Sequence, residues 1–381
     1  MPVFQPSKSG QQPLNIQPKR ILVITLRYLG DTLLVTPLIG SLKQAYPQAR
    51  LDVLLPAANS GMLAGNPDID NLITFPAKPR LRQFIRLLAK LWKDYDLAIA
   101  AQEGDRPTLC AIAAGNISLG FVPEQTGKAW WKQWLLTRWL RHSAQPGHAV
   151  LENLRFCRLL NIQPQYRLTP PRAGIPAEFP ALGGKPYVVM HVMPQWRFKQ
   201  WHAAGWIELA TYLVERGYHI VLTGGNQPTE LDALRALQQQ MPGSVLNLAG
   251  QLALPQLAGL LSKAAFFIGT DTGITHLAAA AGTLTFALFG PTDPRLWAPW
   301  PVDYGKPVAP FAGRGSKQVN NVYLIQGQTE RDCLPCQLEG CERHRNSHSE
   351  CLDNLSARTV MAHIDAALDP DKPGSASKAA G

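Results

Sequence analysis

The chain lacks the segments that would carry it into or through a membrane. Its first 20 residues are polar and hold no apolar core of a secretory signal. No run of about 18 apolar residues is present that could cross a bilayer, and the longest apolar stretch, 277–289, is interrupted by glycine and threonine. We therefore expect a protein of the cytoplasm.

Cysteine and charge are both scarce. Six cysteines in 381 residues do not form the disulfide framework of a small secreted protein, so we expect reduced thiols. The charged fraction of 17% and the hydrophobic fraction of 46% exclude a disordered chain. The length is sufficient for two domains of ordinary size.

Several motifs for nucleotides and metals are also missing. The chain contains no G-x-G-x-x-G fingerprint, no P-loop and no H-E-x-x-H. A nucleotide, if one binds, must therefore be held by a different arrangement.

The positive charge is unevenly distributed. Residues 1–180 carry 21 Lys/Arg and 11 Asp/Glu, whereas residues 181–381 carry 16 of each, so the whole net charge of +10 lies in the first half. This excess favours an anionic partner, such as nucleic acid, acidic lipid or a phosphorylated substrate. No nucleic-acid-binding motif accompanies the charge, so we expect no nucleic acid.

Apolar, strand-like runs alternate with helical patterns in two successive halves of the chain. This rhythm predicts two doubly wound α/β domains in tandem, each with a parallel sheet covered on both faces. A stretch rich in Pro and Gly, 162–186, separates the halves. Such domains are expected to hold a ligand in the cleft between them, near the carboxyl ends of the strands. The expected strands are 21–25, 50–55, 71–75, 96–100, 117–121, 187–192, 218–225, 244–250, 264–270 and 284–290.

Two of these strand ends are followed by polar residues at the start of a helix. After 21–25 the sequence "LRYLGDTLLVTPL" places a carboxylate, Asp31, where a helix begins. After 264–270 the sequence "DTGITHLAAAAG" offers small residues, hydroxyls and a helix N-terminus, which suits a phosphate group. Ordinary helix capping explains both patterns as well. Asp271 would repel a phosphate and is better suited to accept hydrogen bonds from sugar hydroxyls.

Three stretches carry a resemblance to a known family. The sequences "LRYLGDTLLVTPL", "FKQW" (198–201) and "GTDTGITHLAAAAGTLTFALFGPTDPRLWAPW" (269–300) resemble those of the ADP-heptose:lipopolysaccharide heptosyltransferases of glycosyltransferase family 9. The resemblance covers most of 20–365, and the segment 333–352 is most like the heptosyltransferase III branch.

The resemblance implies a GT-B fold, in which two Rossmann-like domains face each other across a cleft. It places an acceptor-binding domain at 20–172 and an ADP-heptose-binding domain at 187–354. The remaining parts are expected to be a flexible N-terminal segment (1–19), a linker (173–186), a C-terminal helix (355–368) and a disordered tail (369–381).

The resemblance also implies an activity: inverting transfer of heptose from ADP-heptose to the inner core of lipopolysaccharide, without a required metal or other cofactor. Asp31 matches the family's catalytic base, which would take the proton of the attacking hydroxyl. Lys199 would stabilise the charge that develops on the departing diphosphate. The residues expected at the donor are Lys199, Glu230, Asp271, Thr272, Gly273, Thr275 and His276, although a buried structural histidine explains His276 equally well. Two alternatives stay open: a nucleotide-sugar epimerase of similar fold, and a catalytically degenerate, membrane-associated binding protein.

Two basic stretches predict a surface for the acceptor or for the anionic inner membrane. Residues 77–93 hold six Lys/Arg and no acid, and residues 127–142 hold four tryptophans and four Lys/Arg. Tryptophan beside cations suits a lipid headgroup or a sugar phosphate, whereas an amphipathic helix with a cationic rim is the structural alternative. The residues expected on this face are Arg82, Arg86, Lys132, Arg138, Trp130 and Trp134.

Four cysteines cluster late in the chain. Cys333, Cys336, Cys341 and Cys351 form the pattern C-x₂-C-x₄-C-x₉-C, with two histidines between the last two cysteines. A structural zinc site, a redox pair and plain buried thiols all fit this pattern.

Overall fold

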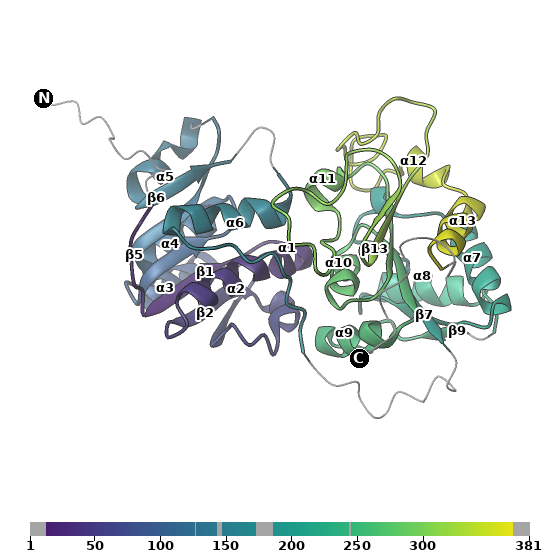
Figure 1. Cartoon of the computed structure of the whole chain (residues 1–381), viewed down its shortest axis with the longest axis horizontal. Coiled ribbons are helices and arrows are strands. Elements are labelled where there is room, and N and C mark those ends of the chain that lie inside the picture. The colour runs from purple at the N-terminus through teal and green to yellow at the C-terminus, as the bar shows by residue number, and fades with distance from the viewer. Residues whose placement is uncertain (1–12, 126, 143–146, 173–185, 244, 369–381) are drawn as a thin grey trace, which may run out of the picture. The chain divides into compact units, whose positions relative to one another are not determined.

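The computed structural model describes residues 13–125, 127–142, 147–172, 186–243 and 245–368 (Figure 1). The chain divides into unit 1, formed by 1–172 with 303–309, and unit 2, formed by 173–302 with 310–381. The sequence did not indicate that 303–309 would group with unit 1. Most of the expected N-terminal segment (1–12), most of the linker (173–185) and the whole tail (369–381) lie outside the described residues.

Unit 1 contains a six-stranded parallel sheet with the strand order β3-β2-β1-β4-β5-β6. Five of its strands match expected ones, and β6 falls in the tryptophan-rich basic stretch, where no strand was expected. Its strands are β1 (Arg20–Ile24), β2 (Arg50–Pro56), β3 (Asn71–Phe75), β4 (Tyr95–Ala100), β5 (Gly115–Val122) and β6 (Arg138–Arg141).

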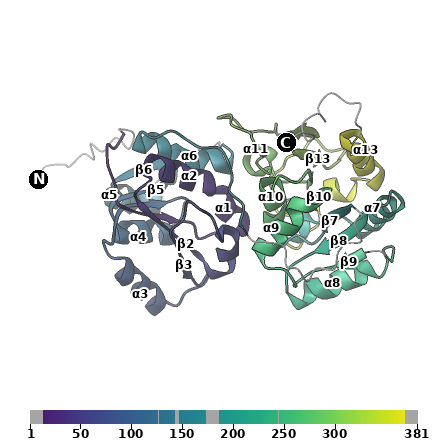
Figure 2. The same ribbon diagram turned by 60° about the horizontal axis from the view of Figure 1, so that its bottom comes forward.

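Helices cover both faces of this sheet (Figure 2). Helices α3 and α4 pack on one face, where Leu87, Leu91 and Cys110 join a buried cluster with strand residues. The helical segment that follows β1 is divided into two helices, α1 and α2, because Pro37 cannot continue a helix that begins at Leu29. The helices are α1 (Leu29–Leu34), α2 (Thr36–Ala45), η1 (Ala57–Leu63), α3 (Leu81–Leu91), α4 (Asp105–Ala114), η2 (Gly127–Ala129), α5 (Trp130–Leu135) and α6 (Ala149–Leu160).

Unit 2 contains a seven-stranded sheet with the order β12-β13-β11-β10-β7-β8-β9, in which only β12 runs antiparallel among the described strands. The strands are β7 (Tyr187–His191), β8 (His219–Thr223), β9 (Val245–Asn247), β10 (Phe266–Thr270), β11 (Thr285–Phe289), β12 (Lys317–Val319) and β13 (Val322–Gln326). The helices are η3 (Arg197–Lys199), α7 (Ala203–Glu215), α8 (Pro228–Gln238), α9 (Leu254–Lys263), α10 (Gly273–Ala280), α11 (Pro294–Trp297), α12 (Glu350–Asp353) and α13 (Ala357–Leu368).

Both units share the same order of their first five strands. In each, the first strand lies between the second and the fourth in chain order, as β1 does between β2 and β4, and β7 between β8 and β10. This is the Rossmann order, and the direction of winding reverses at the first strand. Ligands of such folds bind outside the carboxyl ends of the strands at this reversal point, so each unit has one edge where a site is expected.

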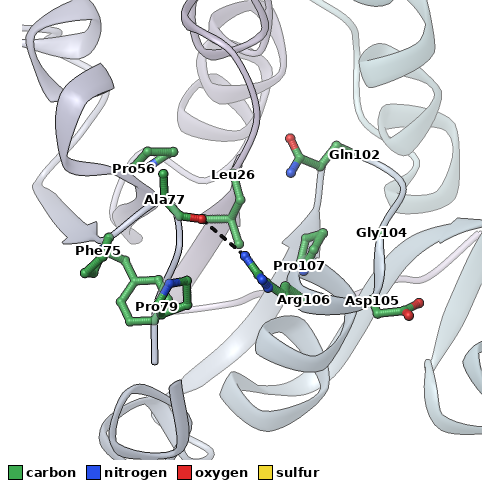
Figure 3. A pocket seen from close by; sticks show the side chains of 11 residues that line it. Leu26, Pro56, Phe75, Ala77, Pro79, Gln102, Gly104, Asp105, Arg106 and Pro107 are labelled. Carbon is green, nitrogen blue, oxygen red and sulfur yellow. Dashed lines mark hydrogen bonds between the residues drawn. The ribbon is translucent and has the colours of Figure 1, made fainter. Parts of the chain in front are cut away.

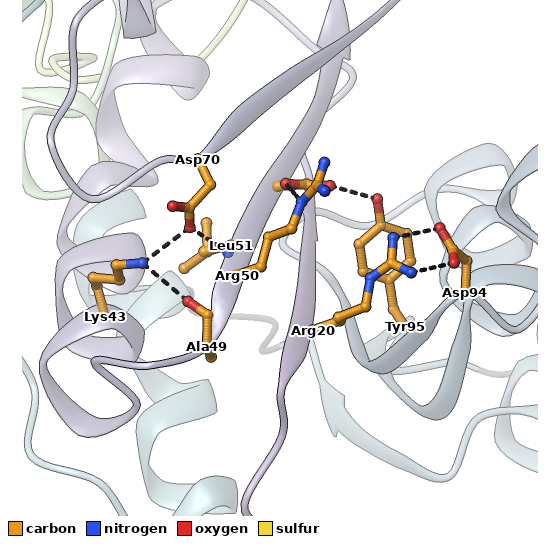
Figure 4. A network of polar contacts seen from close by, with 9 residues as sticks. Arg20, Lys43, Ala49, Arg50, Leu51, Asp70, Asp94 and Tyr95 are labelled. Carbon is orange, nitrogen blue, oxygen red and sulfur yellow. Dashed lines mark hydrogen bonds and ion pairs between the residues drawn. The ribbon is translucent and has the colours of Figure 1, made fainter.

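A polar network ties the strands of unit 1 together near their amino ends, away from that edge (Figure 4). The buried Asp52 carboxylate accepts hydrogen bonds from Arg50 Nε at 3.0 Å and from the Tyr95 hydroxyl at 2.8 Å. Burial and the neighbouring Asp52 raise the pKa of Tyr95, so the phenol stays a donor. In the described part of the chain, no helix has the length and apolar character needed to cross a membrane.

Candidate active site

The turn from β10 to α10 forms the centre of the unit-2 edge. Thr272 is the N-cap of α10, and its hydroxyl accepts a hydrogen bond from the Thr275 backbone at 3.4 Å. The Thr275 hydroxyl is buried and donates to the Thr270 carbonyl at 2.5 Å. The backbone N–H and the hydroxyl of Thr275 therefore both form hydrogen bonds within the turn. Thr275 thus shapes the turn from inside, and its expected contact with ADP-heptose stays a prediction.

Lys199 lies opposite this turn and pairs with Asp271, the carboxylate that is predicted to accept hydrogen bonds from sugar hydroxyls. Its Nζ is 2.5 Å from Asp271 Oδ2, and the side chains are only 17% and 7% exposed. Lys199 comes from the loop after β7, and Asp271 directly follows β10, so the two strands flanking the reversal point supply the pair. The structure thus brings together two of the expected donor residues beside a helix N-terminus.

Two histidines lie buried at the same edge. Burial lowers the pKa of His276 to about 4 and that of His191 to about 4. His191 Nδ1 lies 3.1 Å from the Thr223 hydroxyl. His276 Nδ1 is shielded from solvent and has no hydrogen-bond partner among the described residues. Both rings are neutral at physiological pH, and His276 keeps one ring nitrogen available.

Glu230 lies in the first turn of α8, next to the loop that follows β8. Its Oε1 accepts a hydrogen bond from the Gly225 backbone at 2.7 Å. A Cβ at either Gly224 or Gly225 would lie 2.8 Å from this carboxylate, so glycine is needed for the close approach. The carboxylate therefore stabilises the loop, and its expected contact with a ribose stays a prediction.

Asp31 occupies the third position of α1, after the carboxyl end of β1. Its Oδ2 accepts a hydrogen bond from the Tyr28 backbone at 3.2 Å, and the side chain is half-buried. Tyr28 rather than Asp31 is the N-cap residue. The loop before Asp31 is fixed by Asn59, whose amide donates to the Arg27 carbonyl and to the Thr32 hydroxyl, both at 2.9 Å. The bond to the Tyr28 backbone is compatible with a role of Asp31 as base, which stays a prediction.

A pocket of about 240 Å³ opens at the same edge of unit 1 (Figure 3). It is lined by residues at the carboxyl ends of β1, β2, β3 and β4 or shortly after them, including Leu26, Phe75, Gln102 and Arg106. Arg106 donates to the Ala77 carbonyl at 3.2 Å. Gln102 Oε1 is shielded from solvent and has no partner among the described residues. Sequence reasoning missed these residues, although "QEGDR" (102–106) begins only two residues after the end of the expected strand 96–100.

The structure divides the predicted basic face. Arg82, Arg86, Trp130 and Trp134 are exposed. Lys132 must be removed from this face, because it is only 3% exposed and its Nζ lies 2.9 Å from Asp105 Oδ1. Arg138 is half-buried on β6 and donates to the Thr137 carbonyl. Helix α4 lies between α3 and α5 in both views (Figures 1 and 2).

The four late cysteines differ in environment. Cys333 and Cys341 are exposed, Cys336 is intermediate and Cys351 is buried. Burial raises the pKa of Cys351 to about 12, which disfavours the thiolate. No three Cys, His, Asp or Glu side chains within the described ranges form a group that could hold a metal ion.

Two Rossmann-type units in one chain define a class of fold, the GT-B fold of glycosyltransferases. Solved structures support the fold. The glycosyl transferase family 9 structure from Veillonella parvula DSM 2008 has a TM-score of 0.74 at 18% identity, covering 94% of this chain and 99% of that one. The Escherichia coli ADP-heptose lipopolysaccharide heptosyltransferase II has a TM-score of 0.66 at 19% identity, covering 91% and 98%.

The sequence comparisons identify the family. Residues 84–308 match the model of glycosyltransferase family 9 (heptosyltransferase). Lipopolysaccharide heptosyltransferase 3 of Escherichia coli K12 is 32% identical over 292 residues, which cover 72% of this chain and 83% of the relative. The chain belongs to glycosyltransferase family 9. This membership confirms the resemblance seen in the sequence and favours a glycosyltransferase over a nucleotide-sugar epimerase.

Proposed function

We propose that this chain transfers heptose from ADP-heptose to a sugar of the lipopolysaccharide inner core, with inversion at the anomeric carbon. The identity of 32% to a heptosyltransferase 3 supports the donor and acceptor class. The observation that carries the proposal is the pairing of Lys199 with Asp271 beside the N-terminus of α10. A cation and a helix N-terminus suit a diphosphate, and a carboxylate next to them suits the hydroxyls of the attached sugar.

The proposed reaction assigns one role to each edge. The acceptor hydroxyl would lose its proton to Asp31 while its oxygen bonds to the anomeric carbon of the heptose. The bond between that carbon and the diphosphate oxygen breaks, and ADP leaves with the electron pair. Lys199 and the backbone N–H groups of α10 would stabilise the charge on the departing diphosphate, so that no metal is required. The pocket beside Gln102 and Arg106 is the proposed acceptor site.

We further propose that unit 1 docks on the anionic cytoplasmic surface of the inner membrane. On α3, Leu81 is 72% exposed and Ile85 is also exposed, although both are apolar. Helical spacing places Arg82 and Arg86 beside them on the exposed side. An exposed apolar stripe with a cationic rim is typical of helices that lie in a lipid interface. Trp130 and Trp134 on α5 add a second exposed apolar group, which is aromatic.

The test of the activity is direct. The purified chain is incubated with ADP-heptose and a series of truncated core acceptors, and products are identified by mass spectrometry and by the anomeric coupling in NMR. We expect one heptose to be added with inverted configuration, and the rate to survive EDTA. Transfer that is lost with EDTA and restored by Mg²⁺ would refute the metal-free mechanism, and failure with every core acceptor would refute the proposed acceptor class.

A further inference from the structure

The proposed reaction leaves the cysteine segment, residues 333–352, without a role. This segment packs against the loop that carries Lys199. The Ser349 hydroxyl donates to the Phe198 carbonyl at 2.6 Å, and both residues are buried. Ser349 is the N-cap residue of α12, yet its side chain does not cap that helix. The side chain of an N-cap serine normally forms a hydrogen bond with the first turn of its own helix. Here the Ser349 hydroxyl instead bonds to the carbonyl of Phe198, the residue before Lys199.

Close backbone approach supports the same contact. A Cβ at Gly340 would lie 2.9 Å from the Phe198 Cβ and 1.8 Å from the Ser347 hydroxyl oxygen. The φ of Gly340 is +83°, which side chains rarely adopt. Only glycine therefore lets the cysteine segment lie this near to Phe198.

An aromatic pair links the segment to the lysine head group. The rings of Trp196 and Phe198 stack with centroids 5.8 Å apart and planes 9° apart. Lys199 Nζ lies 5.3 Å from the centroid of Trp196 and 5.9 Å from that of Phe198. Arg345 Cζ, from the cysteine segment, also lies 5.3 Å from the Trp196 centroid. The Trp196 ring thus contacts both Arg345, in the cysteine segment, and Lys199.

We propose that the cysteine segment is a brace that positions Lys199 for the donor diphosphate, with Ser349 and Arg345 as positioning residues. The inference rests on the proposed function, because it assumes that Lys199 contacts the diphosphate. Lys199 ends a single 3₁₀ turn of three residues, and such a short turn has little stability of its own. Its geometry depends on what packs against it. Ser349 fixes the backbone of the turn, and Arg345 fixes the ring beside the ammonium group.

Hydrogen bonds also hold the cysteine segment itself in place. The Cys341 backbone donates to the His348 carbonyl at 3.0 Å, and the Glu350 backbone donates to Cys341 Sγ at 3.3 Å. The Gln337 backbone donates to the Pro291 carbonyl at 2.8 Å, which joins the segment to the loop after β11. These bonds close the segment on itself and attach it to the edge that carries α10.

A double-mutant cycle on ADP affinity, measured by titration calorimetry, tests the brace. Arg345→Ala should weaken ADP binding about two- to fivefold, and Arg345→Lys should restore most of it. In the Lys199→Ala background, Arg345→Ala should have no further effect. Ser349→Ala should show the same dependence on Lys199. Arg358→Ala, which removes an exposed arginine from α13, is the charge-matched control and should leave the affinity unchanged.

Two outcomes would overturn the brace. Equal losses in both backgrounds would mean that Arg345 acts on ADP without Lys199, and no loss in either background would mean that it does not act at all. Thermal unfolding of each variant separates these outcomes from a failure to fold. If the wild-type chain binds no ADP, the proposed function fails as well. If it binds ADP and Lys199→Ala weakens binding while the cycle is additive, only the brace fails.

Discussion

Replacing Asp271 with asparagine should strengthen ADP binding and slow heptose transfer. Lys199 Nζ is already paired with Asp271 Oδ2 at 2.5 Å, and little solvent reaches either side chain. A diphosphate would need the same ammonium group and would be repelled by the carboxylate. We therefore expect binding of ADP to be an exchange, in which phosphate oxygens replace Asp271 as the partner of Lys199.

The size of the effect follows from the strength of the bond that must be exchanged. A hydrogen bond between charged groups contributes about 1.5–3 kcal/mol, roughly twice as much as a bond between neutral groups. Asparagine keeps the size of the side chain but offers Lys199 only a neutral acceptor. The competition then weakens by about 1 kcal/mol, which corresponds to an ADP affinity about fivefold higher. Transfer should fall about ten- to a hundredfold, because the heptose hydroxyls lose a charged acceptor.

Calorimetry with ADP and steady-state transfer with ADP-heptose measure the two effects separately. Asp232→Asn on α8 is the matched control, because it removes an exposed carboxylate that pairs with Arg235 within its own helix, and neither quantity should change. Weaker ADP binding by Asp271→Asn would refute the exchange. It would show instead that the carboxylate helps the lysine to bind phosphate by holding it in place.

Four further predictions concern the rest of the molecule. Asp31→Asn should lower kcat about 100-fold or more with ADP affinity preserved, and near-normal turnover would contradict its role as base. The pKa of His276 is lowered to about 4 in the folded chain, so between pH 6.5 and 4 only the unfolded chain takes up a proton at this residue. The free energy of unfolding, measured with urea, should therefore fall by up to about 3 kcal/mol for this group as the pH falls from 6.5 to 4. The fall should be smaller in His276→Gln. Arg82→Gln combined with Arg86→Gln should reduce co-sedimentation with anionic vesicles at low salt without changing ADP affinity, and unchanged sedimentation would argue against docking by α3. Tyr95→Phe should cost about 1–2 kcal/mol of stability by leaving a buried carboxylate short of one donor, with kinetics unaffected.

Much of the fold was predictable because buried parallel strands have a strong local pattern. Runs such as 21–25 and 284–290 are apolar and short and end at polar or turn-forming residues, and the structure places β1 and β11 there. Strand β6 lacks this pattern, because its four residues, "RWLR", alternate charge with large apolar groups and are at most half-buried. A strand at the edge of a sheet meets few neighbours, so its sequence need not be apolar.

The sequence indicated which strand ends carry the candidate site, but not which side chains pair with each other there. Asp31 and Asp271 follow strand ends that the sequence indicates, and such positions share an edge in a doubly wound fold. The bond between Lys199 and Asp271 joins residues 72 positions apart, and no local pattern encodes it. Lys132 is a second case in which the sequence did not indicate the partner of a charged side chain. The charge count assigned it to the surface, whereas pairing with Asp105 on a neighbouring helix buries it.

The proposed role of Lys199 explains why a segment as distant as 333–352 packs against the loop that carries this lysine. An ammonium group that must meet a diphosphate has to stay charged and in place before the ligand arrives. Asp271 provides the charge partner on one side, but it also competes with the ligand, so it cannot be the only support. The stacked rings of Trp196 and Phe198, held by Arg345 and Ser349, contact the lysine without competing for its hydrogen bonds. If phosphate replaces Asp271 as proposed, we expect these contacts to remain and the lysine to keep its position through the exchange.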